Sequence, residues 1–164
     1  MKLMSVSFKD GAAIPLEHAY DGRNLSPSLI WSEVPEGVRS FALIVDDPDA
    51  PGGTFTHWLL YDLPANIKGL PEGVPKGPTA LLDAKQGVNG FGRLGYDGPR
   101  PPVGPSHRYY FTLYALDGPL GLKPGAGKDQ VERVLSGHVI ASASLRGTFK
   151  TAVLRRLARV LLRR

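Results

Sequence analysis

The segment that most constrains the fold of this chain is residues 41–64, in which two apolar runs flank an acidic turn rich in proline and glycine. An apolar run at residues 41–45 stops at the sequence DDPDAPGG, and an aromatic run follows at residues 55–61. This pattern predicts a strand, a structured loop and a second strand. Proline fixes its own φ and favours an extended residue before it, so we expect a stiff loop to hold the Asp47 and Asp49 carboxylates.

Side chains on the second of these strands should alternate between the two faces of the sheet. The alternation predicts one face that carries His57 together with Phe55, Leu59 and Tyr61. The His57 imidazole is then expected near the carboxylates and among apolar neighbours. We also expect the carboxylates to raise the pKa of nearby histidines, so that anion binding strengthens as the pH falls from about 8 to about 6.

A second segment, residues 95–116, repeats this arrangement with the sequence GYDGPRPPVGPSHRYYFTLYAL. A rigid proline and glycine segment leads into an aromatic strand, on which His107, Tyr109 and Phe111 share one face. Arg108 points to the other face and is expected to pair with an acid. Two stiff loops that each precede a strand histidine would form a pocket if they met at one edge of a sheet.

The rest of the chain indicates a mainly β protein. An opening hairpin is predicted within residues 1–16, a helix at residues 126–139 and a last strand at residues 141–149. Because strands outnumber helices and follow one another, an antiparallel β-sandwich of two sheets with one or two peripheral helices is expected, followed by a C-terminal amphipathic helix.

The net charge of +5 resides in the tail, because residues 151–164 contain five arginines and no acid, while the other residues balance. A neutral body argues against a nucleic-acid partner. The tail predicts a basic amphipathic helix that docks on its own domain or a second subunit, with contact to an anionic membrane surface as the alternative. No cysteine, signal-like run or membrane span is apparent, so we expect a cytoplasmic protein without disulfides.

The motifs DPDAP, HW, GYDGPRPP and HRYYF together resemble the phosphatidylethanolamine-binding protein family, also called the Raf kinase inhibitor protein family, in its bacterial and archaeal branch. The resemblance covers about residues 5–150 and implies one β-sandwich domain at 1–150, to which the tail at 151–164 is an addition. It also implies a small anion pocket, whose ligand-binding residues here would be Asp47, Asp49, His57, Pro101, Pro102, His107 and Tyr109.

Three functions fit these residues. The favoured one is a non-enzymatic protein, without cofactor, that binds a phosphate-like or carboxylate anion such as a phospholipid head group. The resemblance adds inhibition of a kinase or protease, and a homodimer, as expectations. A small hydrolase or isomerase with His57 and His107 as acid and base is the alternative. Zinc or iron is disfavoured by the spacing of the histidines. Tyr96, Pro51 and Phe55 are further candidates for the pocket wall.

Overall fold

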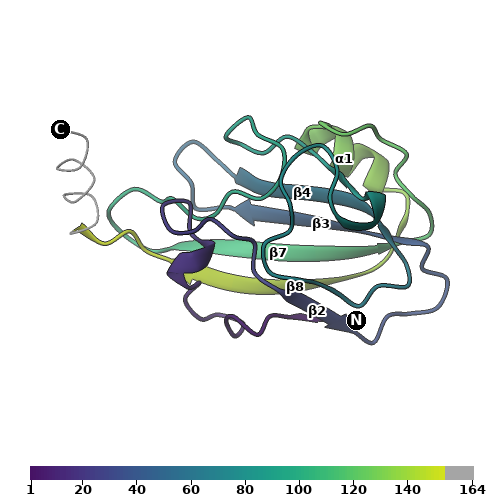
Figure 1. The fold of residues 1–164 in the computed structure, drawn as a ribbon, viewed down its shortest axis with the longest axis horizontal. Helices are drawn as coiled ribbons and strands as arrows, with labels where there is room; N and C mark the ends of the chain where they lie inside the picture. The colour runs from purple at the N-terminus through teal and green to yellow at the C-terminus, as the bar shows by residue number, and fades with distance from the viewer. Residues whose placement is uncertain (154–164) are drawn as a thin grey trace.

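The computed structural model describes residues 1–153, which form a β-sandwich with one α-helix (Figure 1). The predicted fold class, mainly β with two antiparallel sheets and a peripheral helix, is confirmed. The strands, short 3-10 helices (η) and α-helix run in the order β1 (Lys2–Met4), η1 (Leu16–His18), β2 (Leu29–Ser32), β3 (Ser40–Asp47), β4 (Phe55–Pro64), β5 (Gly69–Leu70), η2 (Leu81–Asp83), β6 (Lys85–Gln86), β7 (His107–Leu116), α1 (Lys128–Leu135) and β8 (Val139–Phe149).

The larger sheet has the order β6-β4-β3-β7-β8, and every neighbouring pair is antiparallel. The strand β3 lies in the middle, between β4 and β7, and both of its faces are covered. This position explains the unbroken apolar run at residues 41–45, since a strand buried on both faces has no reason to alternate.

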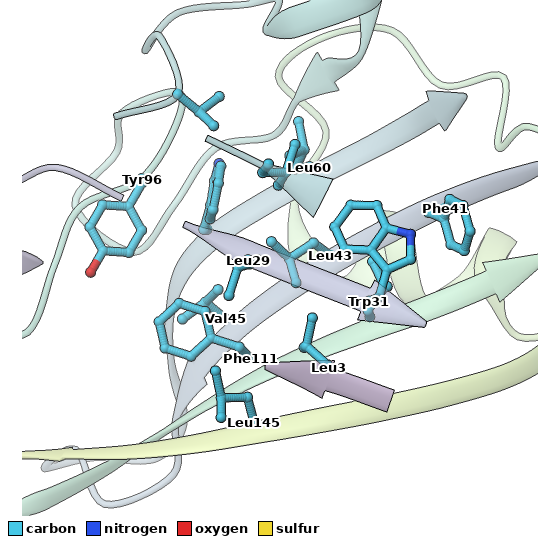
Figure 2. Packing of buried hydrophobic residues seen from close by; sticks show 14 of the residues in the cluster. Leu3, Leu29, Trp31, Phe41, Leu43, Val45, Leu60, Tyr96, Phe111 and Leu145 are labelled. Atoms are coloured by element: carbon cyan, nitrogen blue, oxygen red, sulfur yellow. The ribbon is translucent and has the colours of Figure 1, made fainter. Parts of the chain in front are cut away.

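The smaller sheet, β1-β2-β5, packs against one face of the larger sheet. Figure 2 shows the layer between the sheets, where Trp31 of β2 meets Phe41 of β3 with ring centroids 5.4 Å apart. The opposite face of the larger sheet buries Ile44, Leu59 and Tyr61 under Val131 and Leu135 of α1. Two apolar layers therefore fix the larger sheet from both sides.

Two predicted elements differ from the structure. The opening hairpin is wrong, because β1 pairs with β2 and residues 12–14 run beside β8 at Thr148. A strand of three residues offers few contacts, so the sheet that receives it decides its pairing. The helix is shorter than predicted, Lys128–Leu135. The predicted amphipathic helix at 151–164 lies outside the described residues, except for its first three positions.

Candidate functional site: a small cavity at one end of the larger sheet

The site forms where the last residue of β3 meets the first residues of β4 and β7. Because these strands are antiparallel, Asp47 lies opposite Phe55, and His107 begins the strand on the other side of β3. The two stiff loops predicted from the sequence therefore do meet at one edge. They enclose a cavity of about 150 Å³ that is lined by Asp47, Ala50, Pro51, Phe55, His57, Phe91, Arg100, Pro101, Pro102, His107 and Tyr109.

His57 reaches the cavity through a β-bulge. Val45 pairs with Trp58 and Asp46 pairs with Thr56, so His57 is an extra residue on β4 without an opposite partner. The predicted strict alternation is therefore wrong at this point: Leu59 and Tyr61 pack under α1, whereas His57 contacts the ring of Tyr109 on the cavity side. A bulge bends its strand and redirects one side chain, which sequence alternation alone does not reveal.

The His57 ring is fixed by one hydrogen bond and by aromatic contacts. Its Nδ1 lies 2.7 Å from the Asp97 carbonyl oxygen, which can only accept, so Nδ1 carries a proton. The rings of Phe55, Phe91 and Tyr109 surround it at centroid distances of 5.0 to 5.8 Å. Burial lowers the pKa of His57 below 6.5 and outweighs the opposite effects of the Asp97 carbonyl and the Asp47 carboxylate. The expected net rise of the pKa of His57 is therefore wrong, although the carboxylate acts in the expected direction.

His107 lies in a different environment, because its Nδ1 is 2.7 Å from Oδ2 of Asp47. The Asp47 carboxylate is buried, and its Oδ1 accepts a hydrogen bond from the Asp49 backbone N–H at 2.8 Å. A buried carboxylate next to an imidazole compensates a positive charge on that ring. His107 is therefore the cavity imidazole that is paired with a carboxylate, whereas burial lowers the pKa of His57.

Both rings line the cavity, and each uses its Nδ1 atom for a hydrogen bond. Within residues 1–153 neither Nε2 has a hydrogen-bond partner, and neither is among the fully buried unpaired polar atoms, which are Ser28 Oγ and the Tyr109 hydroxyl. The Tyr109 side chain lines the cavity, and its hydroxyl is buried close to Asp47. Burial and the nearby Asp47 carboxylate raise the pKa of Tyr109, so this hydroxyl keeps its proton.

Asp49 does not line the cavity, although the resemblance placed it among the ligand-binding residues. Its carboxylate accepts hydrogen bonds from the Arg108 backbone N–H, Nε and NH2 at 2.8 to 2.9 Å, on the other side of the loop. These Arg108 hydrogen bonds lower the pKa of Asp49 to about 2. Asp49 thereby attaches the loop to β7. It is also the acid with which Arg108 was expected to pair.

Of the further candidates for the wall, Pro51 and Phe55 line the cavity and Tyr96 does not. The Tyr96 hydroxyl donates to the His18 carbonyl at 2.7 Å, and its ring packs on Trp58. Sequence reasoning missed Phe91 and Arg100. Arg100 stands between prolines in GPRPP, and an arginine in a rigid segment beside a suspected anion pocket was a usable signal.

Asp97 is a second residue that the sequence did not single out. Its buried carboxylate accepts hydrogen bonds from Asn24 and Asn89 at 2.8 Å and from Arg93 at 2.6 and 3.0 Å. Burial opposes ionisation of Asp97, but these donors outweigh it and lower its pKa. The same residue supplies the carbonyl that holds His57. The ion-pair network around Asp97 therefore fixes the loop that orients one cavity imidazole.

Within residues 1–153, no group of three or more histidine, aspartate or glutamate side chains is placed to hold a metal ion. None of the helices in the same residues is long and apolar enough to cross a membrane. The groups that the cavity offers for hydrogen bonding are one imidazole paired with a carboxylate, one imidazole paired with a backbone carbonyl, and the Tyr109 phenol.

The chain is similar to known proteins of one family. The family model described as phosphatidylethanolamine-binding protein matches residues 4–150. A UPF0098 protein from Aquifex aeolicus is 49% identical over 152 residues, covering 92% of this chain and 88% of that protein. The UPF0098 protein YbhB from Escherichia coli is 41% identical and covers 91% of this chain and 99% of its own length.

Solved structures show the same fold. YbcL from Escherichia coli, described as a new member of the mammalian family, superimposes with a TM-score of 0.87 at 34% identity, covering 92% of this chain and 98% of that one. A protein described as a homologue from Chlamydia trachomatis gives a TM-score of 0.84 at 38% identity, covering 92% and 97% of the two chains. The chain belongs to the phosphatidylethanolamine-binding protein family.

Proposed function

We propose that this protein is a binding protein that holds a phosphate monoester or a similar small anion in the cavity between His57, His107 and Tyr109. The observation that carries the proposal is that both imidazoles have their Nδ1 atoms tied to acceptors, so that both Nε2 atoms are free to meet a ligand. The cavity volume of about 150 Å³ suits one phosphate or carboxylate group.

The three groups have distinct roles in this proposal. His107 binds as an imidazolium and donates from Nε2 to a ligand oxygen, while the Asp47 carboxylate balances its charge. The Tyr109 hydroxyl donates to a second oxygen and gains the partner that it lacks in the free protein. His57, neutral at pH 7, accepts from a protonated oxygen of the ligand. A phosphate monoester has both kinds of oxygen near neutral pH, because its second pKa is about 6.

The walls explain why such an anion would be held despite a nearby carboxylate. Ala50, Pro51, Phe55 and Phe91 exclude water around the donors, and a hydrogen bond between charged groups is stronger where water is excluded. A phospholipid head group and a free phosphorylated metabolite share the phosphate, so both are candidate ligands. Inhibition of a protein kinase or protease would require a protein partner in addition to this cavity.

The test is calorimetric titration of ethyl phosphate into the wild type and His107→Gln, with His57→Gln as a second variant. The proposal expects measurable binding by the wild type and a loss of about 10-fold or more in His107→Gln, since one charge-assisted hydrogen bond contributes about 1.5 to 3 kcal/mol. Arg39→Gln is the matched control, because Arg39 is exposed at the opposite end of β3. Equal affinity in all variants would mean that the anion binds elsewhere or that the protein has no anion site, and would refute the proposal.

One observation favours an acid–base enzyme as a second candidate. The two imidazoles have environments that separate their charge states, since one is buried among rings and the other is paired with a carboxylate. Such a pair can act as base and acid on one substrate. Turnover of ethyl phosphate or of a carboxylate ester that depends on both His57 and His107 would favour this candidate, whereas binding without turnover would favour a binding protein.

A further inference from the structure

Beside the cavity lies a guanidinium that the proposed anion site does not use. Arg100 lines the cavity, and its Cζ lies 4.7 Å from the centre of the Tyr20 ring. The Tyr20 ring in turn stacks on Phe91, another cavity wall residue, with centroids 4.7 Å apart. A flat contact between guanidinium and aromatic ring fixes the plane of the arginine head group, and so holds it next to the cavity.

The Arg100 head group has donors to spare. Its Nε lies 3.4 Å from Oδ2 of Asp21, a distance at which the charges attract but the hydrogen bond is weak. Within residues 1–153 its two terminal nitrogens make no hydrogen bond, and 42% of the side chain is exposed. A guanidinium has five N–H donors in a planar fork that matches a carboxylate.

Other charged side chains add to the positive charge around Arg100. The Arg93 guanidinium lies 5.0 Å from the same Tyr20 ring and pairs with Asp97, and Lys76 lies 3.6 Å from the Asp97 carboxylate. The Asp97 carboxylate thus pairs with two cations, Arg93 and Lys76. Because it compensates only one positive charge, an anionic group placed near this cluster meets an excess of positive charge.

We propose that Arg100, held on Tyr20, forms a subsite for a second anionic group, so that the protein selects phosphate monoesters that carry a carboxylate a few atoms from the phosphate. This inference rests on the proposed function, because the first anion is the one in the cavity. It distinguishes this chain from a protein that binds zwitterionic head groups, because the Arg100 guanidinium would repel an ammonium group in the same position.

The experiment compares three ligands of similar size at about pH 6.5, namely 2-phosphoglycolate, ethyl phosphate and O-phosphoethanolamine. Their tails are anionic, neutral and cationic. We expect the wild type to bind 2-phosphoglycolate about 5- to 10-fold more tightly than ethyl phosphate, a modest factor because Arg100 is partly exposed. O-Phosphoethanolamine should bind no more tightly than ethyl phosphate.

Arg100→Gln should remove the preference for 2-phosphoglycolate over ethyl phosphate, because the guanidinium that would meet the carboxylate is gone. Tyr20→Leu should weaken the preference as well, because the guanidinium loses the ring that positions it. Arg39→Gln removes the same charge far from the cavity and should leave the preference intact. Thermal unfolding of each variant establishes that it is folded.

Three outcomes would overturn the proposal. An equal loss for both ligands in Arg100→Gln would mean that Arg100 contacts the phosphate in the cavity. A wild type that binds O-phosphoethanolamine most tightly would mean that Asp21, not Arg100, faces the tail of the ligand. A wild type that binds 2-phosphoglycolate and ethyl phosphate equally would exclude the subsite. If no ligand binds at all, the proposed function fails first.

Discussion

Replacing Asp47 with asparagine gives opposite results under two views of the cavity. If Asp47 only repels anions, Asp47→Asn should tighten binding of a phosphate monoester. If Asp47 holds His107 in its charged form, the same change should weaken it. The structure favours the second view, because the buried Asp47 carboxylate lies 2.7 Å from Nδ1 of His107.

The magnitudes decide between these effects. A carboxylate and an imidazolium with charge centres about 4 Å apart attract by about 4 kcal/mol at an effective dielectric constant of about 20. A ligand on the far side of the ring lies roughly 7 to 8 Å from Asp47, and repulsion at that distance is about 2 kcal/mol at the same dielectric constant. The net expectation for Asp47→Asn at pH 7 is a loss of at most about 2 kcal/mol, or at most roughly 30-fold in affinity, because the part of the attraction that is already present without ligand does not contribute.

The assay is calorimetric titration of ethyl phosphate between about pH 5.5 and about pH 8. The affinity of Asp47→Asn for ethyl phosphate should be lower than that of the wild type at pH 7. Asp49→Asn is the matched control: it removes the same charge two residues away, and the wild-type Asp49 stays ionised throughout, since Arg108 lowers its pKa to about 2. Its affinity should stay within about 2-fold of wild type.

Tighter binding by Asp47→Asn at pH 7 would refute this reasoning. Because Asp47 is buried, the variant must first be shown to be folded by its thermal transition and near-UV circular dichroism. If it is not folded, His107→Gln tests the same pair of side chains: it should also bind ethyl phosphate more weakly than the wild type.

Three further predictions concern stability. Burial lowers the pKa of His57 below its unfolded value near 6.5, so the free energy of unfolding should fall as the pH drops below about 6.5, and urea titrations should find a smaller fall in His57→Gln. Tyr109→Phe removes a buried hydroxyl that has no hydrogen-bond partner in residues 1–153, so this variant should unfold at an equal or higher urea concentration than the wild type. It should bind ethyl phosphate about 10-fold more weakly. Clear destabilisation of the variant would contradict this prediction. Gly98→Ala should lower the free energy of unfolding by more than about 2 kcal/mol, because a Cβ there would lie 1.9 Å from the His18 carbonyl oxygen. Gly137→Ala is the contrast, since nothing lies within 4 Å of its Cβ position and its φ is not positive.

The sequence by itself determined the parts of this protein that depend on local chemistry. Apolar runs stopped by proline and glycine predicted the strands that became β3 and β7, and regular alternation along β7 correctly placed His107 and Tyr109 on one face and Arg108 on the other. Proline and glycine restrict the backbone whatever the tertiary context, so such signals survive folding. The resemblance carried by the same motifs named the family.

Tertiary structure decided what each of these residues does. Asp47 and Asp49 are two acids of the same short loop. Asp47 nevertheless pairs with a cavity imidazole and Asp49 with Arg108, because the loop turns between them. The bulge at His57 depends on how β4 pairs with β3, and the lowered pKa of His57 depends on rings from distant segments. The Arg100 guanidinium is positioned by its contact with the ring of Tyr20, which lies eighty residues earlier in the chain. Register, burial and long-range contacts are properties of the packed chain, and no local pattern encodes them.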